Sequence, residues 1–199
     1  KPADSYGYAA DAFRAALARY GVAEPFGWEW PVVYDAGDVT PAPGDTEAAL
    51  FDTHVRITAA TRALVAQGLF PVAIGGGHDL TLPFVRGVIE YWKSKALTLE
   101  AGVYFDAHLD VRETAGSGMA FRRLIDDYGI KHLTIHGMDP YANSRDHARW
   151  FLTRGGVDGA EAAPEPHTGP KFVSIDLDVL DASVAPGVSA MNPNGWTLD

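Results

Sequence analysis

The sequence of 199 residues contains no cysteine. This absence excludes disulfides, thiolate nucleophiles and cysteine-bound zinc, and it fits a cytoplasmic protein. Basic residues are also few: 16 Lys and Arg stand against 26 Asp and Glu, a formal net charge of −10. This acidic balance argues against binding to nucleic-acid phosphates, which need a clustered basic face. No apolar run approaches the roughly 20 residues that a membrane-spanning helix needs. We therefore expect a cytoplasmic protein with neither a nucleic acid nor a membrane among its partners.

Apolar residues make up 47% of the chain and charged residues 21%, which is typical of a globular domain. Predicted helices alternate with short apolar strands, and this order indicates an α/β domain with a mostly parallel sheet. No predicted helix covers the last strand, so we expect residues 1–199 to form a single domain that lacks its C-terminal part. The predicted helices are 9–20, 46–67, 82–95, 121–128 and 144–154; the predicted strands are 70–74, 102–105, 131–136 and 172–175, with a loop or an edge excursion at 155–170.

Carboxylates and histidines follow three of the predicted strands. The motif Asp-Ala-His-Leu-Asp occupies 106–110, Asp176 and Asp178 follow strand 172–175, and His78 follows a triple glycine after strand 70–74. Ligands bind at the carboxyl ends of parallel strands, and alternate residues of a strand share one face. We therefore expect four carboxylates and two imidazoles to converge, from His78, Asp106, His108, Asp110, Asp176 and Asp178.

Such a cluster favours metal ions. Four neighbouring carboxylates repel one another, which raises their pKa values, and a pair of divalent cations removes this repulsion. Oxygen-rich ligation with one imidazole per metal favours Mn²⁺ over a structural zinc site, although ligand type alone leaves other divalent metals open. Two such ions can activate a shared water as a nucleophile. The remaining histidines lack this context and are interpreted as surface or core residues: His54, His132, His136, His147 and His167.

The same motifs resemble the signature blocks of the ureohydrolase superfamily, which includes arginases and agmatinases. The blocks read GGGHD at 75–79, FDAHLD at 105–110 and SIDLDVLD at 174–181. Arg14 and the stretch DAGD at 35–38 also lie where the family has its N-terminal elements. The resemblance implies a three-layer arginase-like fold, with a mostly parallel central sheet flanked by helices, and a homo-oligomer, either trimer or hexamer. It also implies two Mn²⁺ ions per subunit, bridged by Asp106 and Asp176 and completed by His78 with Asp110 and by His108 with Asp178.

Two departures from arginases favour the formimidoylglutamase branch of this superfamily. Ser117 stands where arginases and agmatinases place a histidine, and a serine cannot relay a proton at neutral pH as an imidazole does. Arg112 stands where arginases have an asparagine, and a guanidinium can bind a carboxylate through two parallel hydrogen bonds. The branch hydrolyses N-formimidoyl-L-glutamate to L-glutamate and formamide in histidine degradation. We therefore expect a dicarboxylate amidine as the small-molecule substrate.

Particular roles follow for four residues. Arg112, Ser117 and Asn143 are predicted to bind the substrate. Arg112 returns to the metal-facing side if the extended conformation persists two residues beyond Asp110. Because no histidine fills position 117, Asp110 is the candidate to accept the nucleophile's proton and pass it to the leaving nitrogen.

Other functions stay open. An arginase, agmatinase or guanidinobutyrase belongs to the same superfamily, but agmatine has no carboxylate for Arg112 to bind. A catalytically silent metal-binding relative is also possible, because the family's last substrate-contacting carboxylate has no counterpart in the sequence. A zinc hydrolase of the histone-deacetylase type shares the broad fold, yet four aspartates and two histidines suit two metals better than one.

Overall fold

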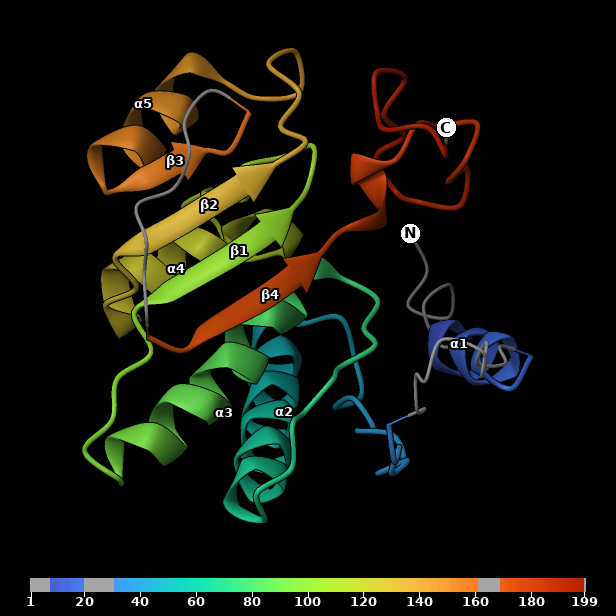
Figure 1. Cartoon of the computed structure of the whole chain (residues 1–199), viewed down its shortest axis with the longest axis vertical. Coiled ribbons are helices and arrows are strands. Elements are labelled where there is room, and N and C mark those ends of the chain that lie inside the picture. Colours follow the sequence, from blue (N-terminus) through green and yellow to red (C-terminus); the bar gives the residue numbers. More distant parts are fainter. Residues whose placement is uncertain (1–7, 20–30, 161–168, 199) are drawn as a thin grey trace, which may run out of the picture.

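The computed structural model describes residues 8–19, 31–160 and 169–198. Within these residues one parallel sheet forms, with the strand order β3-β2-β1-β4 (Figure 1). Parallel neighbours need a crossover connection, usually a helix, and α4 and α5 provide the connections from β1 to β2 and from β2 to β3. The predicted α/β class, with a mostly parallel central sheet flanked by helices, is confirmed. The strands are β1 (Ala101–Phe105), β2 (His132–His136), β3 (Gly156–Asp158) and β4 (Lys171–Ile175).

The helices lie close to where the sequence places them, because local signals mark their ends. Thr46 accepts a hydrogen bond from the backbone N–H of Ala49, and Ser144 caps α5 in the same way. Gly129, with φ +74°, ends α4 in the left-handed conformation. The helices are α1 (Ala9–Leu17), α2 (Glu47–Ala66), α3 (Thr81–Lys93), α4 (Ala120–Tyr128) and α5 (Arg145–Thr153), and three short 3₁₀ helices are η3 (His78–Leu80), η4 (Ser117–Met119) and η5 (Leu177–Val179).

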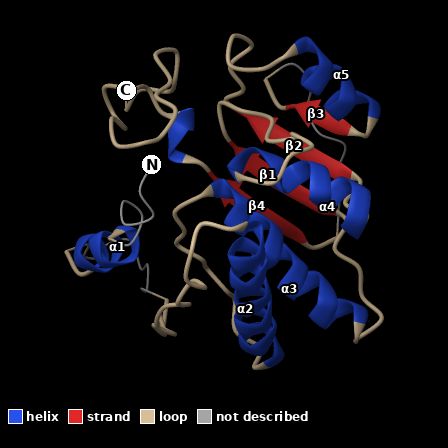
Figure 2. Ribbon diagram, turned by 180° about the vertical axis from the view of Figure 1, so that it is seen from behind, coloured by secondary structure: helices blue, strands red, loops and turns tan. Residues whose placement is uncertain are grey.

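The core lies on one face of the sheet. Tyr104 of β1 is fully buried there, between Phe121 of α4 and Phe151 of α5, with ring centroids 3.8 and 6.1 Å away. Figure 2 shows α4 in front of β1 and β2, and in Figure 1 it lies behind them. The ring of Phe172 occupies the space where a side chain at Gly102 would project, so glycine lets β4 pack closely against β1. The carboxyl ends of β1 and β4 are thus fixed from this face.

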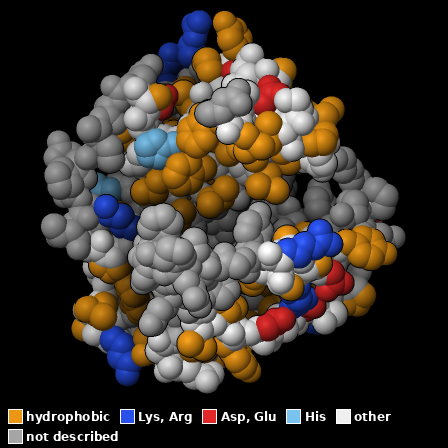
Figure 3. Space-filling model, turned by 45° about the vertical axis from the view of Figure 1, so that its right-hand side comes forward, with side chains coloured by type: hydrophobic (Ala, Val, Ile, Leu, Met, Phe, Trp, Pro, Cys, Tyr) orange, Lys and Arg blue, Asp and Glu red, His pale blue; other side chains and the backbone are white. Residues whose placement is uncertain are grey.

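The opposite face of β4 is open. Val173 and Ile175 point there and are 60% and 65% exposed. The outer edge of β4 has no strand partner among the described residues. Figure 3, which brings the right-hand side of Figure 1 forward, shows hydrophobic side chains gathered at the surface on this side. This flank of the sheet therefore differs from the packed face.

One strand prediction was wrong. Residues 70–74 form no strand: Phe70 is 92% exposed and Val72 is 70% exposed. An apolar run becomes a strand only where a neighbour pairs with its backbone, and this run has no such neighbour in the described residues. The stretch 155–170, predicted as a loop or an edge excursion, contains β3, which is the edge strand next to β2. Three residues are too short to show a period, so the strand itself was not predicted. Residues 161–168 of that loop lie outside the described residues, as does Tyr20 of the first predicted helix.

No helix among the described residues is long and apolar enough to cross a membrane.

Candidate metal centre

Six polar side chains converge at the carboxyl ends of β1 and β4. His78, in η3, is the centre of the first group. Its Nδ1 atom lies 2.9 Å from Asp106 Oδ2, 3.0 Å from Asp110 Oδ2 and 3.2 Å from Asp176 Oδ2. Three carboxylate oxygens therefore surround one imidazole nitrogen.

His108 is the centre of the second group. Its Nδ1 atom lies 2.9 Å from Asp178 Oδ2 and 3.6 Å from Asp106 Oδ1. Asp106 consequently stands between the groups, with one carboxylate oxygen toward each imidazole. The ligand atoms of His78, Asp106 and Asp110 lie within 4.8 Å of one another, as do those of Asp106, His108 and Asp178. The structure brings together all six residues that the sequence predicts as metal ligands.

The route to this convergence differs from the prediction. The β conformation of β1 ends at Phe105, and residues 106–110 form a bent loop. Asp110 has φ +48°, a left-handed conformation that non-glycine residues adopt at some energetic cost. Its carbonyl accepts a hydrogen bond of 3.1 Å from the backbone N–H of Phe121. Loop folding, and not strand alternation, therefore aims Asp110 at His78. Likewise, His78 follows an extended segment and not a strand.

Backbone hydrogen bonds orient the carboxylates. Asp176 Oδ1 accepts from the N–H of Asp178 at 3.0 Å, and Asp178 Oδ1 accepts from the N–H of Ala107 at 3.2 Å. Asp106 Oδ1 accepts from the N–H of His108 at 2.7 Å. Each aspartate thereby keeps its other oxygen, Oδ2, directed at an imidazole. Asp-x-Asp motifs commonly cap turns, and here the capping bond is what aims the free oxygen.

Two hydroxyl groups that the sequence analysis did not single out support His78. Its Nε2 atom lies 2.9 Å from Ser174 Oγ, and this hydroxyl lies 3.1 Å from Thr81 Oγ1. A hydrogen bond at Nε2 fixes the ring and leaves Nδ1 for the centre. A signal for Ser174 was present in the sequence, because it stands two residues before Asp176 at a buried position of β4.

The electrostatics of the centre follow from burial and charge. Burial lowers the pKa of His78, but the surrounding carboxylates of Asp106, Asp110 and Asp176 outweigh this effect and raise its pKa to about 12. Asp106 and Asp178 raise the pKa of His108 to about 10. Burial raises the pKa of Asp106 to about 6. The carboxylates therefore favour positive charge at both imidazoles, and a bound cation would supply positive charge in place of protons.

The residues fit a metal ion by a further criterion. His78 Nδ1 and Asp106 Oδ2 are buried, and neither makes a hydrogen bond of normal geometry with any described residue. The two atoms lie 2.9 Å apart, but their contact does not have the alignment of a hydrogen bond, so their bonding capacity is not met within the protein. A cation would satisfy both atoms, and a donor set of carboxylates with imidazole suits Mn²⁺. The donor chemistry therefore agrees with the predicted metal.

The residues predicted to bind the substrate lie at the margins of this centre. Ser117 is exposed and begins η4, which packs next to the 3₁₀ helix of His78. Arg112 is exposed and lines a cavity of about 480 Å³, together with Arg122 and Trp150 among others; none of the six converging residues lines it. Because Asp110 leaves the extended conformation, the alternation on which the placement of Arg112 depends does not hold.

The side-chain amide of Asn143 is occupied by hydrogen bonds within the protein. It hydrogen-bonds to the backbone of Ala107, Leu109 and Asp139 at 2.8–2.9 Å. Among the remaining histidines, His54 is buried on α2 with Nε2 2.9 Å from Asp79 Oδ2. His167 lies outside the described residues.

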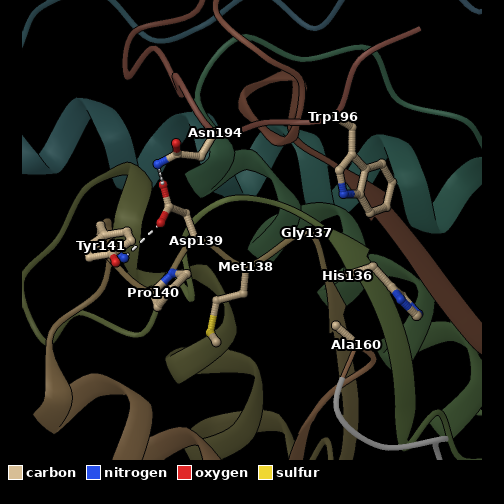
Figure 4. A pocket seen from close by; sticks show the side chains of 9 residues that line it. All are labelled: His136, Gly137, Met138, Asp139, Pro140, Tyr141, Ala160, Asn194 and Trp196. Atoms are coloured by element: carbon tan, nitrogen blue, oxygen red, sulfur yellow. Dashed lines mark hydrogen bonds between the residues drawn. The ribbon is translucent and has the colours of Figure 1, made fainter. Parts of the chain in front are cut away.

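A second cavity, of about 410 Å³, opens beside the carboxyl ends of β1 and β2 (Figure 4). His136 lines it and stacks on Phe105, with ring centroids 5.3 Å apart, and Trp196 contacts Phe105 edge-on, with centroids 5.9 Å apart. Asp139 accepts a hydrogen bond from Asn194 across its rim. The cavity is lined by His136, Gly137, Met138, Asp139, Pro140, Tyr141, Ala160, Asn194 and Trp196.

Fold and site together define a parallel α/β protein with a candidate two-metal centre at the ends of its strands. The sequence model of the arginase family matches residues 5–199, and the chain belongs to this family. The resemblance stated from the motifs is thus confirmed.

Two named relatives are similar to this chain over most of its length. The chain is 30% identical over 201 residues to a formimidoylglutamase from Rhodococcus jostii, a match that covers 90% of this chain and 60% of that protein. It is 31% identical over 189 residues to a guanidinopropionase from Pseudomonas aeruginosa, covering 83% and 56% of the two chains. The chain therefore spans less than two thirds of the length of these relatives.

Solved structures agree with the fold. The crystal structure of formimidoylglutamase from Bacillus subtilis has a TM-score of 0.81 at 25% identity and covers 96% of this chain and 65% of its own. Trypanosoma cruzi formiminoglutamase with Mn²⁺ has a TM-score of 0.78 at 25% identity and covers 96% and 69%.

Proposed function

We propose that this protein is a dimanganese hydrolase of a linear amidine, with N-formimidoyl-L-glutamate as its substrate. Water adds and the C–N bond to the glutamate nitrogen breaks, giving L-glutamate and formamide. The observation that carries the proposal is the position of Asp106, a buried carboxylate with one oxygen toward each of two imidazoles. The named similarity to formimidoylglutamases supports the substrate.

Under this proposal two Mn²⁺ ions would be held by the six converging residues. His78 and Asp110 would contribute to one site and His108 and Asp178 to the other, and Asp106 and Asp176 would complete the set, as the family resemblance implies. When bound, the pair supplies Lewis acidity and a bound water of lowered pKa. The protein contributes the preset direction of its ligands, because three aspartates are already oriented by backbone N–H groups.

Asp110 is the proposed catalytic residue. Its Oδ2 atom lies 3.0 Å from His78 Nδ1, so the carboxylate stands beside the centre. There it can hold a proton at Oδ2 and deliver it to the leaving nitrogen of the substrate. Ser117, on the exposed side of η4, and Arg112, on the adjoining loop, remain the predicted contacts for the substrate.

A second candidate substrate class is a guanidino acid, and the similarity to the guanidinopropionase favours it. The two classes give different products: an amidine of the formimidoyl type releases formamide, and a guanidino acid releases urea. A homo-oligomer is proposed on the family resemblance alone and a cytoplasmic location on the absence of cysteine. Light scattering of the purified protein tests the first.

The test is to incubate the Mn²⁺-loaded protein separately with formimidoylglutamate, 3-guanidinopropanoate, 4-guanidinobutanoate, arginine and agmatine. We expect formamide from the first and no urea from the others. Release of urea would overturn formimidoylglutamate as the substrate but would leave the proposed class of hydrolase unchanged. Mn²⁺ binding without turnover of any compound would instead indicate the catalytically silent relative.

A further inference from the structure

We propose that Asn143 is a positioning residue, which holds the backbone on both sides of His108 and thereby aims this imidazole into the centre. The proposal rests on the proposed metal centre. The observation behind it is that the Asn143 amide contacts the two residues that flank His108. Its Oδ1 accepts from the N–H of Leu109 at 2.9 Å, and its Nδ2 donates to the carbonyl of Ala107 at 2.8 Å.

This pairing substitutes for a strand neighbour. The N–H of Asp106 still donates to the carbonyl of His136 at the end of β2, at 3.0 Å, but residues 107–110 have no bond to a strand ladder. Ala107 and Leu109 are buried, at 0% and 1% exposure, and their backbone groups need partners away from water. A primary amide offers an acceptor and donors in one plane. Asn143 can therefore bind both neighbours of His108 at once, as a paired strand would.

Other contacts of the loop leave this task to Asn143. The hydroxyl of Tyr104 donates to the carbonyl of Leu109 at 3.2 Å, and the N–H of Ala107 donates to Asp178. These two bonds hold the carbonyl of Leu109 and the N–H of Ala107, which are not the groups that Asn143 binds. Among the described residues, the N–H of Leu109 donates its hydrogen bond to Asn143 alone. Loss of this side chain would leave the N–H of Leu109 without its acceptor, and the carbonyl of Ala107 would keep only the N–H of Asp139.

Asn143 is itself anchored to the cavity of Figure 4. Its Nδ2 also donates to the carbonyl of Asp139 at 2.8 Å, and the N–H of Asp139 donates to Ala107 at 3.0 Å. The carboxylate of Asp139 in turn accepts from the N–H of Tyr141 at 2.8 Å and from Asn194 at 3.3 Å, as the dashed lines in Figure 4 show. The amide thus joins the loop of His108 to the wall of this cavity.

The experiment compares four full-length forms of the chain: wild type, Asn143→Ala, Asn143→Asp and Ser144→Ala. Ser144→Ala is the matched control, because it removes the cap of α5 at the next residue without touching the loop. Mn²⁺ alone is titrated into each metal-free protein by calorimetry. We expect Asn143→Ala and Asn143→Asp to raise Kd by about 10–100-fold, the range for groups that orient a ligand. Ser144→Ala should lower the melting temperature and leave Kd unchanged.

Amide hydrogen exchange at Leu109, measured without metal, supplies the second readout. Asn143→Ala removes the acceptor and should accelerate this exchange, whereas Asn143→Asp keeps an acceptor oxygen and should preserve protection. An aspartate has no donor for Ala107, so only the donor side is lost. A merely destabilised protein would not separate the two variants in this way.

The outcomes are distinct. Wild-type Kd in both Asn143 variants overturns the positioning role while leaving the metal centre intact. If Asn143→Ala does not fold, Asn143→Asp alone decides through its Kd. If the wild type binds no Mn²⁺, the proposed metal centre is wrong, and this inference is overturned together with it.

Discussion

The two faces of the sheet are built differently. On one face Tyr104 is fully buried between aromatic rings of α4 and α5, and on the other Val173 and Ile175 of β4 are mostly exposed. The candidate metal centre lies at the end of the packed face, where Phe121 contacts both Tyr104 and the ring of His78. The ligands are therefore placed on the part of the molecule with the strongest packing, which is where a preset geometry is best maintained.

The largest effect is expected at the buried carboxylate that ends the packed strand. Asp106→Asn should abolish catalytic activity and weaken Mn²⁺ binding at both positions, since one carboxylate faces both imidazoles. Metal analysis, circular dichroism and formamide release measure the result. Asp127→Asn on the exposed surface of α4 is the control. Full metal content and activity in Asp106→Asn would exclude a shared ligand.

A matched pair of substitutions compares a buried phenylalanine of the packed face with an exposed one by their effect on the free energy of unfolding. Phe121→Ala should lower the free energy of unfolding by about 3–5 kcal/mol, because it empties a fully buried position. Phe70→Ala removes the same atoms from a side chain that is mostly exposed, and it should change stability by at most about 0.5 kcal/mol. Urea denaturation gives both values. Equal losses would show that Phe70 is covered in solution.

A smaller effect is expected from a hydroxyl that supports the centre from β4. Ser174→Ala removes the partner of His78 Nε2, and Kd for Mn²⁺ should rise by about tenfold, at the low end for such groups. Val173→Ala, one residue earlier on the open face, is the control and should leave Kd unchanged. Calorimetric titration measures both. The same Kd in the two variants would remove Ser174 from the set of supporting residues.

The smallest effect is expected on the open face itself. Val173→Lys should change the free energy of unfolding by no more than about 0.5 kcal/mol, because the side chain already lies in solvent. A lysine on an edge strand also discourages pairing with other chains. Light scattering at increasing concentration should therefore show less self-association than in the wild type. A large loss of stability would mean that this face is packed.

Much of the fold was predictable from local sequence signals. The helix ends at Thr46, Ser144 and Gly129 depend on capping and backbone conformation that each residue type supplies by itself. Strands β1, β2 and β4 are short apolar runs between turns. In contrast, the run at 70–74 has the composition of a strand but not the partner, and composition contains no information about partners.

The sequence by itself determined which six residues meet at the centre, because their motifs fix both residue type and position after β1 and β4. The tertiary structure decided how they meet. The left-handed turn at Asp110 and the contact of Phe121 with its carbonyl depend on α4 packing beneath the loop. Asn143 contacts residues 34 and 36 positions away, and no local pattern predicts a hydrogen bond across that distance. The chemistry of each side chain is given by the residue type alone, whereas the direction in which it points depends on contacts with elements distant in the chain.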